Sequence, residues 1–119
     1  MISAEGAATL EVVEQFNAAF NRHDVDEIMR WMTDDCVFEN TSPAPDGERY
    51  EGAAAVRQVW ERLFAASPNA VFHIEEQFAA GDRAFVRWRY DWGTGHVRGV
   101  DLFRVHDGKI AEKLSYVKG

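Results

Sequence analysis

The residue with the clearest chemical potential is Asp101, a carboxylate on a strand face that is otherwise apolar or small. Alternate residues of a strand share a face, and those that share it with Asp101 are Val97, Gly99, Phe103 and Val105. A carboxylate there must find a partner or stay protonated, because burying an unpaired charge is costly. Two interpretations stay open. Asp101 points into a cavity as an acid, a base or an anchor for a substrate hydroxyl, or it pairs with Arg87 or Arg89 on the neighbouring strand.

His73 is a second candidate for acid–base chemistry, because imidazole titrates near neutral pH. Its spacing predicts a polar strand face shared with Glu75 and Gln77. There it either faces a cavity mouth or is a solvated structural residue, and both alternatives stay open. We find no His, Asp and Glu spacing typical of a metal site and no glycine loop typical of a phosphate cradle. We therefore expect no metal and no cofactor.

Composition narrows the functional classes. The 119 residues carry a formal net charge of −7, which repels phosphate backbones and disfavours nucleic-acid binding. No segment approaches the roughly 20 apolar residues of a membrane span. The chain does not open with basic residues and an apolar run, so we expect a cytoplasmic protein. Its one cysteine, Cys36, lies in an apolar run and is predicted to be buried. The length suits one domain over residues 1–119.

Helical periodicity predicts three helices in the first half of the chain. The first covers residues 9–20. Asp24 is predicted to cap the second, whose buried stripe runs from Val25 to Met32 and which ends at residues 33–35. The third covers residues 53–66, and its wide apolar face consists of Val56, Val59, Trp60, Leu63 and Phe64.

After residue 70 the hydrophobic period changes to two, which predicts four strands. They cover residues 71–78, 83–92, 96–105 and 109–117, and a short strand over 36–40 with a polar loop precedes the third helix. The turn pair Asp107-Gly108 between two alternating runs is a strong hairpin signal. Helices followed by an antiparallel sheet are typical of an α+β fold.

The strand over residues 83–92 carries large side chains on both faces. Trp88 and Tyr90 share one face, whereas Arg87 and Arg89 share the other. The simplest interpretation places the Trp88 face on the core. A sheet covered by helices on one side and by a second subunit on the other also fits, because soluble monomers rarely expose large apolar patches. In either case we predict a homodimer through the outer sheet face.

Five motifs follow one another along almost the whole chain: Phe16–Ile28, Thr33–Asn40, Gly52, Gly81–Arg83 and Arg98–Glu112. In order and spacing they resemble the superfamily of nuclear transport factor two, ketosteroid isomerase and SnoaL-like polyketide cyclases. The resemblance implies a cone-shaped fold, in which N-terminal helices pack on a strongly curved, mixed, mostly antiparallel sheet and leave a pocket at its concave face. This superfamily contains enzymes and non-enzymes, so the fold alone does not decide the function.

The resemblance assigns each site residue of the steroid isomerases to a position in this chain. Just one of these positions has a residue of the same type. The tyrosine donor of the first helix falls on Phe16, and the carboxylate base falls on Asn40. The supporting tyrosine falls on Trp60 and the protonated aspartic acid on Asp101. An amide cannot shuttle a proton and a phenyl ring has no hydroxyl to stabilise an enolate. We therefore do not expect the steroid isomerase mechanism.

Epoxide hydrolases of the same superfamily suggest a minor alternative. They place an Asp-Arg-Asp group in the cavity, and Asp101 with Arg87, Arg89 or Asp91 would supply part of it. Asn40 would orient the attacking water through its amide.

Together these features predict a protein that binds a small molecule. We expect it to be a cofactor-independent isomerase, hydrolase or cyclase that acts on an apolar metabolite of modest size. Asp101 and His73 are the catalytic candidates. The predicted ligand-binding residues are Asn40, Phe16, Phe20, Val59, Trp60, Arg87, Arg89 and Tyr116. The alternative is a non-catalytic ligand-binding or dimer-assembly domain. An open cavity of roughly 300 Å³ with Asp101 exposed to it favours the enzyme, whereas a filled cavity with Asp101 in a salt bridge favours the alternative.

Overall fold

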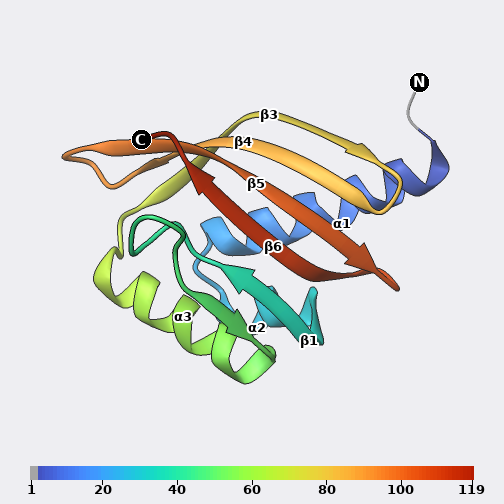
Figure 1. The fold of residues 1–119 in the computed structure, drawn as a ribbon, viewed down its shortest axis with the longest axis horizontal. Helices are drawn as coiled ribbons and strands as arrows, with labels where there is room; N and C mark the ends of the chain where they lie inside the picture. The colour runs from blue at the N-terminus through green and yellow to red at the C-terminus, as the bar shows by residue number, and fades with distance from the viewer. Residues whose placement is uncertain (1–2) are drawn as a thin grey trace.

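Helices packed on one face of a curled sheet make up the computed structural model, which describes residues 3–119 (Figure 1). The helices are α1 (Ala4–Asn21), α2 (Val25–Arg30) and α3 (Ala53–Ala66). The strands are β1 (Met32–Glu39), β2 (Arg49–Glu51), β3 (Val71–Ala80), β4 (Arg83–Asp91), β5 (His96–His106) and β6 (Lys109–Val117). This arrangement confirms the predicted α+β class.

The six strands form one mixed sheet in the order β2-β1-β6-β5-β4-β3. Only the β1–β6 pair is parallel among the described strands, and the other pairs are antiparallel. Figure 1 shows β3 to β6 curling over α1, with α3 facing the other end of the curl. The sheet is curled but not closed, so the cone-shaped fold is confirmed. None of the described helices combines the length and the apolar character needed to cross a bilayer.

Helix α1 lies along the concave face because one of its sides is apolar. Val13 and Phe16 on that side are fully buried. The helix begins earlier than the predicted residue 9, because Ser3 caps it: its Oγ accepts a hydrogen bond from the Gly6 N–H at 3.0 Å. Thr9 then anchors the helix to the sheet, since its hydroxyl donates to the Gly81 carbonyl at 2.7 Å.

The boundary between α2 and β1 differs from the sequence prediction. Helix α2 ends at Arg30, and Met32 is the first residue of β1 rather than part of the helix. The cause is tertiary pairing: Met32 lies opposite Ile110 of β6, and the Ile110 N–H donates to the Trp31 carbonyl at 2.7 Å. The predicted break at residues 33–35 is therefore wrong. Strand β2, which lies in the predicted polar loop, pairs with β1 through Tyr50 opposite Phe38.

A β-bulge in the β5–β6 hairpin sets which side of β6 faces the helices. Next to the turn, His106 lies opposite Lys109 and Val105 opposite Ile110, but Arg104 then lies opposite Glu112. Ala111 is thus the extra residue of the bulge. Beyond it every side chain of β6 is on the opposite face from the one that an unbroken register would give.

A second bulge, in β3, lies between Ile74 and Glu76. It places His73 opposite Arg89 and Gln77 opposite Val86. Residues that lie opposite each other on neighbouring strands share a face of the sheet. Gln77 therefore shares the concave face with the buried Val86, whereas His73 shares the outer face with Arg89. The prediction that they share one polar face is therefore wrong.

The concave face of the sheet carries the core. Ala84, Val86 and Trp88 are buried there, which confirms the simplest interpretation of this strand. Cys36 is also fully buried, as predicted, and burial raises the pKa of its thiol to about 11. A thiol of that pKa is almost entirely protonated at neutral pH, so it acts as a small apolar side chain.

Gly99 allows the Trp88 indole to lie across β5. The two residues are paired on neighbouring strands. A Cβ at Gly99 would lie 2.2 Å from the Tyr116 carbonyl oxygen and 2.6 Å from Cζ2 of Trp88. Both atoms belong to groups that cannot move freely, since one is backbone and the other is a buried ring.

We expect Gly99→Ala to lower the free energy of unfolding by about 3 kcal/mol, the upper range for overpacking of a filled core. Urea denaturation monitored by circular dichroism measures the change. Gly95→Ala is the matched control, because its added Cβ meets just the ring of Trp92, which is 40% exposed and can yield. Equal stability of Gly99→Ala and the parent protein would contradict this account.

Candidate functional site

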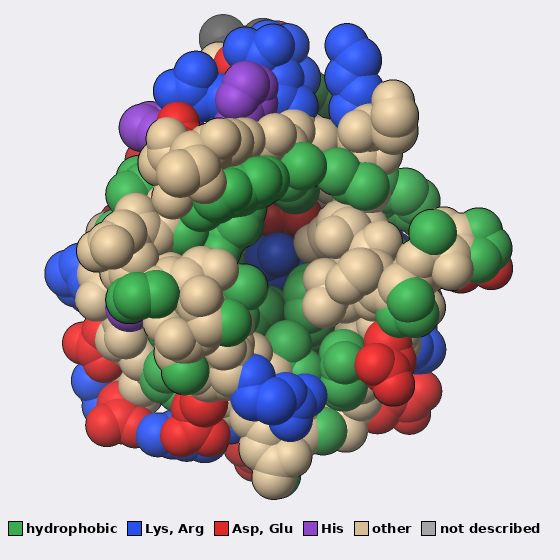
Figure 2. All heavy atoms as spheres, turned by 90° about the vertical axis from the view of Figure 1, so that its left-hand side faces the viewer, with side chains coloured by type: hydrophobic (Ala, Val, Ile, Leu, Met, Phe, Trp, Pro, Cys, Tyr) green, Lys and Arg blue, Asp and Glu red, His purple; other side chains and the backbone are tan. Residues whose placement is uncertain are grey.

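A cavity lies between the helices and the concave face of the sheet. Its main compartment has a volume of about 100 Å³ and is lined mostly by aromatic and aliphatic side chains from α1, α3 and five strands. Figure 2 looks into the hollow: hydrophobic side chains frame it, and a basic side chain lies at its floor. The lining residues are Phe20, Phe38, Asn40, Thr41, Trp60, Leu63, Phe72, Trp88, Tyr90, Val97, Lys113 and Ser115.

A narrow annex of about 10 Å³ continues the cavity. It shares Phe20, Phe72, Trp88 and Lys113 with the main compartment and adds Asn17, Ile74, Val86 and Asp101. The annex is at the lower limit for a single water, which needs about 10–15 Å³. The main compartment is far larger than that limit.

At the floor of the cavity, Lys113, Asp101 and Ser115 form a closed polar cluster. Lys113 Nζ lies 3.2 Å from Asp101 Oδ2 and donates to Ser115 Oγ at 3.0 Å. The Ser115 hydroxyl in turn donates to Asp101 Oδ1 at 2.6 Å. The side chains of Lys113 and Asp101 are just 6% and 4% exposed. Asp101 is therefore held by one hydrogen bond and one ion pair, and neither partner is Arg87 or Arg89.

The strand register explains how these three side chains meet. Asp101 on β5 lies directly opposite Ser115 on β6, and Lys113 lies opposite Phe103. Lys113 and Asp101 are thus diagonal neighbours on the concave face, a separation that a long side chain can span. Without the bulge at Ala111, Lys113 would lie opposite Leu102, on the outer face.

Aromatic rings surround the Lys113 ammonium on its remaining side. Its Nζ lies 4.8 Å from the centroid of the Phe38 ring, 5.6 Å from Trp60 and 5.8 Å from Phe20. Ring faces attract a cation at such distances, more strongly when water is excluded. The rings therefore help to compensate the loss of hydration that burial of the ammonium entails.

Several buried N–H donors of the cavity lack a partner. They are the side-chain amide of Asn17 and the indole nitrogens of Trp60 and Trp88. Each of these residues lines the main compartment or the annex. Buried polar groups are normally hydrogen-bonded. The polar groups that the cavity leaves free are thus donors.

Four of the sequence-predicted site residues lie at the cavity. Phe20, Asn40 and Trp60 line the main compartment, and Asp101 lines the annex. The side-chain oxygen of Asn40 accepts a hydrogen bond from the Thr41 N–H at 2.7 Å. Two more, Phe16 and Val59, are buried in the adjoining core. The Phe16 ring contacts Phe103 edge-on, with centroids 5.7 Å apart.

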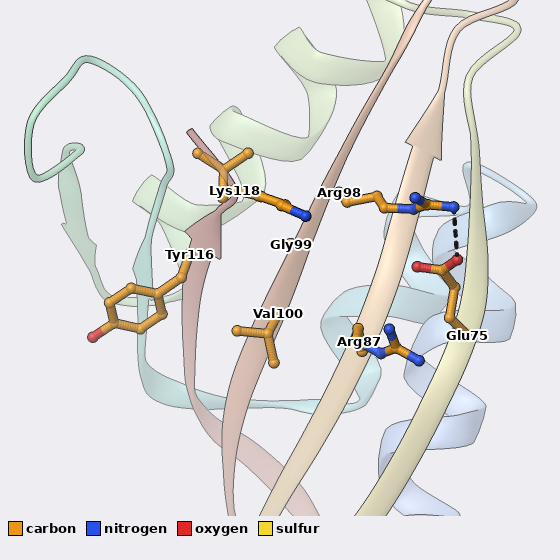
Figure 3. A pocket seen from close by; sticks show the side chains of 8 residues that line it. Glu75, Arg87, Arg98, Gly99, Val100, Tyr116 and Lys118 are labelled. Atoms are coloured by element: carbon orange, nitrogen blue, oxygen red, sulfur yellow. Dashed lines mark ion pairs between the residues drawn. The ribbon is translucent and has the colours of Figure 1, made fainter.

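The other four predicted residues lie on the outer face of the sheet, away from the Lys113 cluster. His73 and Arg89 lie opposite each other on that face, and the exposed Arg87 forms an ion pair with Glu76 at 3.4 Å. Arg87 and Tyr116 border a shallow concavity of about 400 Å³. Figure 3 shows this second hollow, where Arg87, Arg98, Val100, Tyr116 and Lys118 project from three neighbouring strands and the β6 end.

Sequence reasoning missed two members of the polar cluster, Ser115 and Lys113, and the predicted facing of Lys113 shows why. A simple alternating register from the Asp107-Gly108 turn places it on the outer face. The available signal was the consecutive apolar pair Ile110-Ala111, since both residues are buried and thereby break the alternation. Within residues 3–119, no three His, Cys, Asp or Glu side chains gather closely enough to hold a metal ion.

The fold and its concave-face cavity are those of a nuclear-transport-factor-two-like protein. The SnoaL-like domain family matches residues 13–113, so the chain belongs to that family. No curated protein matches the chain.

Solved structures show the same fold. An NTF2-like protein of unknown function from Mesorhizobium loti is 44% identical, covers 100% of this chain and 98% of its own, and has a TM-score of 0.89. A candidate ketosteroid isomerase from Kribbella flavida is 16% identical over 97% of this chain and 81% of its own, with a TM-score of 0.84. An LEH-like epoxide hydrolase from M. tuberculosis is 22% identical over 96% and 85%, with a TM-score of 0.74.

We expect the buried Lys113–Asp101 pair to be strongly coupled. Lys113→Met alone should lower the free energy of unfolding by about 3–5 kcal/mol, because it leaves Asp101 buried without its counter-ion. The double variant Lys113→Met, Asp101→Asn should cost much less than the sum of the two single variants. Urea denaturation of the four proteins at neutral pH gives the coupling energy.

The outer-face pair Arg104–Glu112 is the matched control for this cycle. Its N···O distance is 3.0 Å, but its side chains are 34% and 24% exposed. We expect a coupling of about 0.2–1 kcal/mol for Arg104→Met with Glu112→Gln. A coupling no larger than this for Lys113 and Asp101 would refute the structural role of the buried pair.

Proposed function

We propose that this protein binds a small, mostly apolar molecule that carries a hydrogen-bond-accepting oxygen. The observation that supports this proposal is the polar cluster of Lys113, Asp101 and Ser115 at the floor of a cavity with aromatic walls. Such a cavity, apolar with a few convergent polar groups, is typical of small-molecule sites.

The size of the cavity indicates a compact ligand. Its main compartment, about 100 Å³, is smaller than the roughly 300–1,000 Å³ of sites for drug-sized molecules. A single ring with a short substituent suits that space better than a steroid. The flat walls formed by Phe20, Trp60 and Trp88 favour an aromatic or alicyclic ring.

The free donors favour an oxygen acceptor on the ligand. Lys113 donates one hydrogen bond to Ser115 and forms an ion pair with Asp101, so its three N–H bonds leave at least one for a ligand. The unpartnered indole N–H groups of Trp60 and Trp88 add to this supply. Lys113 and Asp101 already balance each other's charge, so an incoming carboxylate would be buried without compensation. A neutral carbonyl oxygen accepts hydrogen bonds from these donors and adds no charge to the cavity.

The same cluster favours ligand binding over catalysis by a free Asp101 carboxylate. Both oxygens of its carboxylate are engaged, one by Ser115 and one by Lys113. His73 lies on the opposite face of the sheet and is not available to act with it. Of the two alternatives that the sequence left open, a ligand-binding domain therefore has the better support, and Asp101 holds Lys113 in place.

We expect acetophenone to bind about tenfold more tightly than α-methylstyrene, which has the same shape but no oxygen. The tenfold factor corresponds to about 1.4 kcal/mol, the order of one hydrogen bond in a site where unpaired donors are costly. Isothermal titration calorimetry measures both affinities, and a thermal shift provides an independent check because binding stabilises the folded state.

A variant that fills the cavity provides the control for this experiment. Val97→Phe adds a ring to the main compartment, whereas Val71→Phe adds one at an exposed position of β3. The first should abolish binding of acetophenone and the second should not. If Val97→Phe binds as tightly as the parent protein, the ligand occupies another place and the proposal fails.

A second proposal concerns assembly: we propose that the outer sheet face forms a homodimer. Phe78 and Tyr116 are each 54% exposed on this face, and Phe78 stacks on Phe85 with ring centroids 5.0 Å apart. Soluble monomers rarely expose such groups together. Residues of both signs alternate around them, as in the Arg98–Glu75 pair at 3.3 Å (Figure 3). A surface with both signs can be complementary to itself across a twofold axis.

We expect sedimentation equilibrium to give twice the chain mass of 13.5 kDa. Tyr116→Glu should shift the protein to the monomer, because it would bury a carboxylate in the interface. Trp92→Glu is the control, since Trp92 is similarly exposed but lies in the loop after β4. A parent protein that sediments as a monomer at micromolar concentration would refute the dimer.

A further inference from the structure

We propose that Lys113 is a nucleophile that forms an imine with small aromatic aldehydes bound in the cavity. This inference rests on the proposed ligand site and goes one step beyond it, from a hydrogen bond with a carbonyl oxygen to a covalent bond with the carbonyl carbon. The structural basis is a primary amine at the floor of an aromatic cavity, in direct contact with a group that can take its proton.

The position of Lys113 suits attack on a bound carbonyl. It lines both compartments, and its side chain is 6% exposed, so bulk water has little access to its nitrogen. Desolvation in an apolar pocket is one of the ways in which proteins activate lysine as a nucleophile. The rings of Phe38, Trp60 and Phe20 lie within 5.8 Å of Nζ, so an aromatic ring packed against them brings its carbonyl group close to the amine.

The neighbours of Lys113 provide a route for its proton. Nζ contacts Asp101 Oδ2 at 3.2 Å directly and Asp101 Oδ1 through the Ser115 hydroxyl, by bonds of 3.0 and 2.6 Å. Transfer of one proton to the carboxylate converts the ion pair into a neutral amine and a neutral acid.

The reaction balances with the groups present. The neutral Nζ attacks the carbonyl carbon, a C–N bond forms, and the π electron pair moves to oxygen. A proton passes from nitrogen to that oxygen, which gives a neutral carbinolamine. Protonated Asp101 then donates its proton to the hydroxyl, the C–O bond breaks and water leaves. The product is a protonated imine beside the Asp101 carboxylate, so the cavity begins and ends with one cation and one anion.

Reductive trapping tests this inference on the unmodified chain. Benzaldehyde and sodium cyanoborohydride are added at neutral pH to the folded protein, and peptide mapping by mass spectrometry locates the benzyl groups. The sequence holds just three lysines, Lys109, Lys113 and Lys118, so the exposed Lys109 and Lys118 serve as internal references. We expect Lys113 to be labelled at least about tenfold faster than either, because the cavity concentrates the aldehyde beside its nitrogen.

Three further measurements distinguish occupancy of the cavity from reaction at Lys113. Methyl benzoate has the same ring and a carbonyl oxygen but forms no imine, so it should block labelling of Lys113 and leave Lys109 and Lys118 unaffected. Ser115→Ala keeps the Lys113–Asp101 pair while it removes one of the two proton routes, and should slow the labelling severalfold. Lys118→Arg should leave the rate at Lys113 unchanged.

The outcomes distinguish the two proposals. If benzaldehyde raises the melting temperature of the protein but Lys113 is labelled no faster than Lys118, the nucleophile inference is wrong and the ligand site stands. If benzaldehyde, acetophenone and methyl benzoate neither stabilise the protein nor change its labelling, both proposals fail. Because all these readouts are made on the parent protein, a variant that fails to fold cannot obscure them.

Discussion

The β-bulge at Ala111 is the constraint on which the site depends. Strand side chains alternate between faces, so one extra residue exchanges the two faces of everything beyond it. In β6 that exchange turns Lys113 toward the helices, where it lies diagonally across from Asp101. An unbroken hairpin would place an unpaired carboxylate in the core and an unpaired ammonium on the outer face. The bulge thereby gives the buried Asp101 carboxylate its counter-ion.

The walls of the cavity follow from close packing around that pair. The Trp88 indole closes one side, and it can lie there because Gly99 has no side chain to oppose it. On the other side, Asn21 holds the backbone of Phe72 by two hydrogen bonds of 2.9 Å each. These contacts fix aromatic rings on both sides of the ammonium. Since ring faces attract cations and exclude water, they stabilise the pair and also make the cavity suitable for an apolar ligand.

The fold could be predicted from sequence because its signals are local: helical spacing, alternation and the Asp107-Gly108 turn act over a few residues. Asp101 could be identified because a carboxylate on an apolar strand face is conspicuous. The facing of Lys113 and His73 could not be predicted by counting residues, since each lies beyond a bulge or beside one. Met32 was assigned to a helix because its pairing partner, Ile110, is distant in the sequence. Errors thus arose where long-range pairing overrides local pattern.

The departures from the steroid isomerase pattern are mutually consistent. An isomerase needs a base that takes up and releases a proton, and a neutral acid that donates a hydrogen bond to an enolate. Here the Asn40 amide cannot take up and release a proton, and Phe16 packs against Phe103 in the core instead of offering a hydroxyl. Lys113 then supplies a counter-charge to the one acidic group that is retained, so Asp101 forms an ion pair with Lys113 and accepts a hydrogen bond from Ser115 instead of donating one to a ligand. The donor that faces the cavity has thereby moved from the aspartic acid to the lysine. A shared cone-shaped fold thus presents a hydrogen-bond donor at its floor in both cases, but from a different residue.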